Sequence, residues 1–200
     1  MIQRIAVFML YCAQLGLFIF ELVAKYDTHG RQVALAITNV VSVALFIVVQ
    51  YIVRRRYGIV IHWIVLLIIS ASVWLDAMGN FLHFYGSIWW WDRLTHAVGG
   101  LAVTTGFFVV TISLWRAGRM RVSWFVVNLY AFCLAQTLGA LYEVSEWIGD
   151  TLFVTHRIGN GFDTPRDLFF NMLGGLIALA VAYLWRMRYR AVNTHAETRH

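Results

Sequence analysis

The sequence predicts an all-α, polytopic membrane protein with six transmembrane helices in one bundle, and three observations support this fold class. The 200 residues are 60% hydrophobic and only 13% charged, with a single proline, which is far from the composition of a soluble domain. Six segments approach the roughly 20 apolar residues that span a bilayer. Nine tryptophans, nine tyrosines and fourteen phenylalanines are typical of aromatic belts at the two membrane interfaces.

The six segments are joined by short polar connections, so residues 1–200 are expected to form a single transmembrane domain. We place the helices at about 4–25, 32–53, 59–82, 93–115, 122–148 and 166–187. The first apolar run is too long for the core of a secretory signal, and no small-residue cleavage site follows it. It is therefore expected to remain as the first helix.

The basic residues predict that both termini are cytoplasmic. With the N-terminus inside, eleven of the 16 Lys and Arg residues fall on the inner side, where positive charge collects in membrane proteins. The inner set is Arg4, Arg54, Arg55, Arg56, Arg116, Arg119, Arg121, Arg186, Arg188, Arg190 and Arg199. The outer set is Lys25, Arg31, Arg93, Arg157 and Arg166. Because this topology explains the net charge of +6, no nucleic-acid partner is expected.

The acidic residues collect at the outer ends of the third to sixth predicted helices. They are Asp76, Asp92, Glu143, Glu146, Asp150, Asp163 and Asp167, and the polar residues Asn80, His83, His96 and Asn171 lie at similar depth. Carboxylates beside hydrocarbon are costly, and they usually mark a functional site. Apart from Glu197 in the C-terminal tail, no acid is placed at the inner face.

Asp92 and His96 are four residues apart at the start of the fourth helix, so both face the same side. They are candidates to bind one metal ion, or the carboxylate orients the imidazole. Gly99 and Gly100 follow on that face and would let another helix approach closely. The alternative is a helix-capping Asp beside an interfacial His.

Glu143, Glu146 and Asp150 lie on one face near the end of the fifth helix. The Glu-x-x-Glu pair resembles the inward carboxylates of di-metal helix bundles, although those bundles usually carry Glu-x-x-His. We expect Glu143 and Glu146 to be catalytic or metal-binding and Asp150 to be solvated. The alternative is that Glu146 is solvated as well.

The last helix is expected to start with Thr164 as its cap and Pro165 as its first residue. Asp167 is then either a capping residue or a ligand, and spacing does not decide between them. Asn171 continues its face, and Gly174 and Gly175 end it with a notch for close packing.

Other polar residues have a supporting role or none. Asp76, Asn80 and His83 form one stripe that either supports the site or makes a structural hydrogen-bond network. Arg157 lies in a loop that is either a flap receiving an anionic headgroup or a plain turn. Glu21 and Lys25 are expected to form an ordinary pair within the first helix.

The sequence lacks a G-x-S-x-G motif, a Walker loop, an H-E-x-x-H motif and a cysteine pair at metal spacing. Any chemistry is therefore expected to use carboxylates and imidazole, with a bound divalent cation such as Zn, Fe or Mn.

Three blocks, WDRLTH at 91–96, YEVSEW at 142–147 and DTPRDL at 163–168, resemble signature blocks of the YjdF-like family of prokaryotic inner-membrane proteins. The similarity covers about residues 70–180, although Gly-Asn-Gly-Phe stands where the family has Gly-Asp-x-Trp. A fainter similarity to the VanZ-like family rests on the Asp-x-x-x-His pair and on Asp167, Asn171 and Gly174. The resemblance implies an inner-membrane location and no particular reaction. It marks Asp92, His96, Glu143, Glu146, Asp163 and Asp167 as site residues.

Two functions fit these observations. The first is a metal-dependent membrane enzyme, by default a hydrolase, that acts on a lipid or lipid-linked substrate at the outer leaflet. The second is a non-enzymatic protein, either an accessory subunit of a membrane complex or a small transporter. The lack of acids toward the inner ends of the third to sixth helices counts against transport.

Overall fold

The computed structural model describes residues 2–25, 29–153, 159 and 161–197. This part of the chain contains helices and short connections and no strand. Six helices are long and apolar enough to cross a membrane, which confirms the predicted fold class. The helices are α1 (Ile2–Val23), α2 (His29–Tyr57), α3 (Trp63–Phe81), α4 (Phe84–Ser87), α5 (Trp91–Arg116), α6 (Trp124–Phe153) and α7 (Asp163–Glu197).

The connection before α5 and the start of α7 differ from the prediction, and α2, α6 and α7 also end later than predicted. The aromatic connection before α5 contains α4, a single turn that ends with the Ile88 N–H bonded to the Phe84 carbonyl at 2.8 Å. At its start, α7 includes the expected cap Thr164, because the helix already begins at Asp163. Pro165 still lies in the first turn, where its missing N–H leaves no hydrogen bond unmade.

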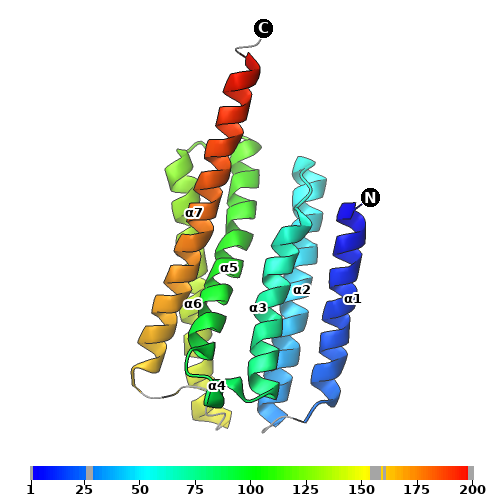
Figure 1. Cartoon of the computed structure of the whole chain (residues 1–200), viewed down its shortest axis with the longest axis vertical. Coiled ribbons are helices and arrows are strands. Elements are labelled where there is room, and N and C mark those ends of the chain that lie inside the picture. The colour runs from blue at the N-terminus through cyan, green and yellow to red at the C-terminus, as the bar shows by residue number, and fades with distance from the viewer. Residues whose placement is uncertain (1, 26–28, 154–158, 160, 198–200) are drawn as a thin grey trace.

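Both termini lie at one end of the bundle (Figure 1), as an even number of spans requires. Arg54, Arg55 and Arg56 lie in the last turn of α2, and Arg116 is the last residue of α5, both at that end of the bundle. The starts of α5 and α7 and the end of α6 lie at the opposite end, which is therefore where the acidic residues meet. Which end faces the cytoplasm stays a prediction.

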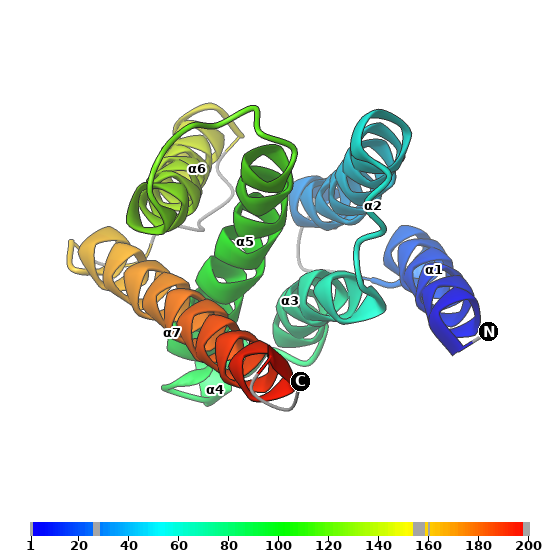
Figure 2. The same cartoon turned by 90° about the horizontal axis from the view of Figure 1, so that it is seen from above.

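Helix α5 is the centre of the bundle, with α3 on one side and α6 and α7 on the other (Figure 2). The two N-terminal helices pack mainly on each other and on α3. Leu10 of α1 and Phe46 of α2 join Leu66 of α3 in a buried apolar cluster. Elsewhere many large apolar side chains are exposed, as expected for helices that face lipid rather than water.

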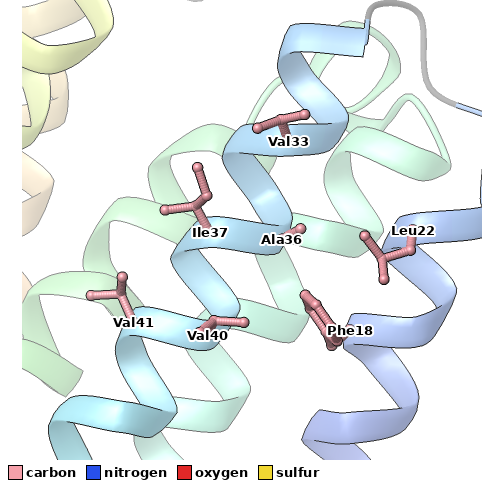
Figure 3. A pocket seen from close by; sticks show the side chains of 7 residues that line it. All are labelled: Phe18, Leu22, Val33, Ala36, Ile37, Val40 and Val41. Atoms are coloured by element: carbon pink, nitrogen blue, oxygen red, sulfur yellow. The ribbon is translucent and has the colours of Figure 1, made fainter.

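A groove of about 260 Å³ lies between α1 and α2 and is lined only by apolar side chains (Figure 3). Phe18 and Leu22 form the α1 side, and Val33, Ile37 and Val40 lie on the α2 side. No charged residue lines it. Such a surface is suited to contact with lipid chains in the bilayer core.

Glu21 does not form the expected pair with Lys25. The Glu21 side chain is fully buried and accepts a hydrogen bond of 3.2 Å from Asn39 Nδ2 of α2, whereas Lys25 is exposed. The reason is that α1 ends at Val23, so Lys25 does not continue the helical face that carries Glu21. Instead Gln32 Nε2 caps α1, donating to the carbonyls of Glu21 and Leu22 at 2.8 Å each.

Glycines allow the backbones of α5 and α7 to touch, as the sequence predicts. A Cβ added at Gly100 would overlap the backbone carbonyl of Asn171, and one added at Gly174 would overlap the carbonyl of Ala97. At these two positions the helices are so close that only the hydrogen side chain of glycine fits between them. This approach fixes how the side chains at the ends of α5 and α7 meet.

Gly100→Ala is expected to destabilise the protein by about 1–3 kcal/mol, because a methyl forced into a packed contact must displace backbone. Thermal unfolding of the detergent-purified protein, followed by tryptophan fluorescence, measures this as a lower Tm. Gly106→Ala is the control on the same helix, since an added Cβ there meets nothing within 4 Å. Equal effects of the two substitutions would contradict the close contact.

Candidate metal centre

His96 of α5 lies at the centre of a group of acidic side chains from three helices. Its Nε2 is 3.5 Å from Asp92 Oδ1, one turn earlier on α5, and 3.7 Å from Asp167 Oδ1 on α7. One ligand atom from each of these three residues lies within 4.8 Å of the others. Asp92 and His96 share one face of α5 because they are four residues apart. The close backbone contact between α5 and α7 brings Asp167 to this pair.

The spacing of these atoms fits a metal ion. In a tetrahedral site with metal–ligand bonds of about 2.1 Å, the ligand atoms are roughly 3.4 Å apart. The two measured separations from His96 Nε2, 3.5 and 3.7 Å, are close to this value. Three protein ligands would leave a fourth position open, as in catalytic rather than structural zinc sites.

Glu143 of α6 approaches the other side of the same imidazole. It is only 4% exposed, and its Oε1 is 3.9 Å from His96 Nδ1. This separation is too long for a hydrogen bond, so Glu143 acts on His96 as a nearby negative charge. The Oε1 of Glu143 and the Oδ1 of Asp167 are buried and have no hydrogen-bond partner among the described residues. Both oxygens lie within 4 Å of a ring nitrogen of His96, and buried acceptors without a hydrogen bond carry a desolvation cost.

Arg166 supplies the positive charge that the structure shows in this group. Its guanidinium bonds Asp92 Oδ2 at 3.0 Å, forms an ion pair with Asp163, and brings Nε to 3.8 Å from Asp167 Oδ1. Asp163 in turn accepts a hydrogen bond of 2.7 Å from the Gly159 N–H. Sequence reasoning counted Arg166 only as an outer charge. Arg166 lies three residues after Asp163 and directly before Asp167, and this spacing could have identified it as a partner of these acids.

Asn171 lies one turn below Asp167 on α7 and is buried between α5 and α6. A Cβ added at Gly139 of α6 would lie 3.2 Å from Asn171 Nδ2, and one added at Gly99 of α5 would lie 4.0 Å from its Oδ1. The predicted polar face of α7 therefore points into the bundle. Asn171 packs between the helices below the His96 group and is not one of the three residues of the ligand group.

Asp76 and Asn80 form a separate network on α3. Asn80 Nδ2 donates to Asp76 Oδ1 at 2.9 Å, and the Tyr85 hydroxyl donates to the same atom at 2.7 Å. Tyr85 also reaches Thr95 Oγ1 at 3.4 Å, and Thr95 Oγ1 donates to the Asp92 carbonyl at 2.7 Å. This chain of hydrogen bonds links Asp76 to the start of α5.

Tyr85 is suited to remain a donor in this network. Although the residue is 37% exposed overall, burial of its hydroxyl and the neighbouring Asp76 carboxylate raise the pKa of Tyr85 well above its ordinary value of 10.0. The hydroxyl therefore keeps its proton and continues to stabilise the Asp76 carboxylate at physiological pH.

Four other predicted residues lie apart from the His96 group or outside the described residues. Glu146 and Asp150 are half-buried further along α6, and neither belongs to the three-residue ligand group. His83 is exposed at the start of α4 with a left-handed backbone, φ 57°. Arg157 lies outside the described residues. The catalytic or ligand role of Glu146, the supporting or substrate-binding roles of His83 and Arg157, and the solvation of Asp150 stay predictions.

The chain matches the family described as "Predicted membrane protein (DUF2238)" over residues 6–188. It is also 31% identical over 131 residues to an uncharacterised protein of Thermotoga maritima, an alignment that covers 61% of this chain and 67% of that protein. No solved structure matches. These similarities are consistent with the YjdF-like resemblance and add no assigned reaction.

Arg166→Ala is expected to destabilise the metal-free protein by roughly 1–3 kcal/mol, since it removes charged hydrogen bonds and leaves neighbouring carboxylates to repel. The Tm of detergent-purified protein in chelator measures the loss. Arg93→Ala is the control, because Arg93 is next to Asp92 but, among the described residues, its hydrogen bond of 2.9 Å and its ring contact are both with Trp89. A Tm equal to that of the control would show that Arg166 does not hold the acids together.

Proposed function

From the premise that this chain belongs to the family described as "Predicted membrane protein (DUF2238)", we propose that it is a metal-dependent membrane enzyme of hydrolase type. The observation that carries the proposal is the convergence of Asp92, His96 and Asp167 at ligand spacing inside an apolar bundle. Burial of so many ionisable groups costs free energy, and proteins usually retain such groups for function.

The donor set favours a borderline transition metal. One imidazole nitrogen and two carboxylate oxygens suit Zn, Fe or Mn, and the absence of thiolate ligands excludes a soft-metal site. Glu143 would hold the His96 ring from its Nδ1 side. When bound, a divalent cation would polarise a substrate oxygen or activate a bound water molecule as a nucleophile.

Arg166 would change its role when the carboxylates bind a cation. Asp92 and Asp167 are partners of its guanidinium in the metal-free arrangement. As metal ligands they would need less compensation from Arg166, whose planar group suits phosphate and carboxylate oxygens. The remaining acids, above all Glu146 one turn beyond Glu143, are candidates for the general base.

The position of the group favours a lipid or lipid-linked substrate. Asp92 lies in the first turn of α5 and Asp167 lies one turn after the start of α7, at the end of the bundle opposite the termini. Trp89 is 79% exposed and Trp90 is 43% exposed just before α5, which is typical of the lipid headgroup region. If the termini are cytoplasmic, this end faces the outer leaflet of a prokaryotic inner membrane.

The alternative function is an accessory subunit in which the same residues form a structural ion-pair network. Arg166 favours this alternative, because its guanidinium pairs directly with acids of α5 and α7. A metal measurement separates the two functions.

The purified protein, exchanged into Zn²⁺, Fe²⁺ or Mn²⁺ and desalted, is expected to retain about one metal ion per chain by elemental analysis. His96→Ala and Asp167→Asn should abolish retention, because each removes a ligand. Glu143→Gln keeps the size of the side chain and should weaken metal affinity about 10–100-fold through the orientation of His96. Asp150→Asn, on the same helix, is the matched control and should retain the metal.

A folded wild-type protein that binds none of the three metals would rule out the enzyme and leave the subunit function. Activity is then sought by incubating the loaded protein with an inner-membrane lipid extract and measuring new hydrolysis products by mass spectrometry. Products formed equally by His96→Ala would exclude this centre as their source.

A further inference from the structure

A second buried polar cluster joins α1 to α2, away from the His96 group. It consists of Gln14 and Glu21, two turns apart on one face of α1, and Asn39 of α2. Their exposed fractions are 2%, 0% and 1%. The proposed metal centre on α5, α6 and α7 uses none of these residues.

Asn39 connects the other two side chains. Its Nδ2 donates to Glu21 Oε2 at 3.2 Å and to the Gln14 carbonyl at 3.3 Å, and its Oδ1 accepts from Gln14 Nε2 at 3.2 Å. Both N–H groups of the Asn39 amide and one N–H group of the Gln14 amide are therefore used within the cluster. The three side-chain heads meet at one point between the two helices.

The acceptors of the cluster exceed its donors. Gln14 Oε1 and Glu21 Oε1 are both buried and have no hydrogen-bond partner among the residues that the structure describes. No lysine or arginine in that part of the chain pairs with Glu21, and the Asp76 carboxylate on α3 repels it. A buried carboxylate oxygen and a buried amide oxygen without donors each carry a desolvation cost.

A small monovalent cation would satisfy these atoms. Carboxylate and amide oxygens are the ligands of hard cations, whereas imidazole and thiolate ligands, which transition metals favour, are missing. Among the three side chains of the cluster only Glu21 carries charge, so a monovalent ion neutralises the cluster itself. A divalent ion would leave an unpaired charge in a low-dielectric interior.

We propose that Gln14, Glu21 and Asn39 form a sodium site that ties α1 to α2. Glu21 Oε1 and Gln14 Oε1 are its primary ligands, and Asn39 holds both side chains in place. The site is separate from the divalent centre in position, charge and ligand type.

The test is the Tm of the detergent-purified full-length protein, with NaCl exchanged for choline chloride at constant ionic strength and with chelator present. Because an ion that binds only the folded state raises stability with its concentration, Na⁺ is expected to raise the wild-type Tm by several degrees, and the rise should saturate. Choline should not reproduce it. Binding of radioactive ²²Na⁺ should give about one ion per chain.

Three variants sharpen the test. Glu21→Gln keeps the side-chain size and should abolish both the Na⁺-dependent Tm shift and ²²Na⁺ binding. Gln14→Met removes one oxygen ligand and should weaken both. Gln3→Met is the control on the same helix, because Gln3 bonds Ile61 and Trp63 at the start of α3, and it should keep the wild-type response.

Two results would overturn the proposal. One is a wild-type Tm that is the same in sodium and choline, together with no ²²Na⁺ binding, which is what a protonated Glu21 would give. The other is a Na⁺ response that persists in Glu21→Gln. Neither result bears on divalent metal binding at His96, so the two proposals fail independently.

Discussion

The cost of gathering carboxylates at one end of an apolar bundle is the constraint on which the rest of this structure depends. Asp92, Asp167 and Glu143 do not spread around the rim of the bundle, where water would solvate them, but converge on His96. Such an arrangement is stable only if positive charge or shared protons offset the repulsion. Arg166 provides part of that charge, while two of the buried carboxylate oxygens have no hydrogen-bond partner among the described residues.

The sequence predicted the bundle well because its information is local. Hydrophobic length defines a span, and residues four apart on a helix share a face, so Asp92 and His96 were identified together. Glu143 and Asp167 were identified on their own helices, but nothing local says that both lie against His96. Their position depends on how α6 and α7 pack against α5. The glycines allow close packing of these helices but do not determine which helices pack together. Arg166 was overlooked because its long side chain reaches a neighbouring helix.

Glu21 illustrates a different limit. The i, i+4 spacing from Glu21 to Lys25 is correct for an ion pair within a helix, yet α1 ends between them. The position of a helix end in a membrane protein depends on its neighbour, here Gln32 of α2, which caps the last carbonyls of α1. The residue expected to pair with Lys25 within its own helix is therefore among the most deeply buried of the described residues. The bundle thus holds two polar groups of different chemistry, one rich in acids and one with a single carboxylate.

The backbone contacts between α5 and α7 fix the positions of His96 and Asp167 relative to each other. His96 lies four residues before Gly100, and Asp167 lies seven residues before Gly174. One residue inserted into either interval would rotate the side chain beyond it by about 100° and move it by about 1.5 Å along the helix axis. The connections between helices carry no such restriction. Relatives that keep this site are therefore free to change length in their loops but not in these two short intervals.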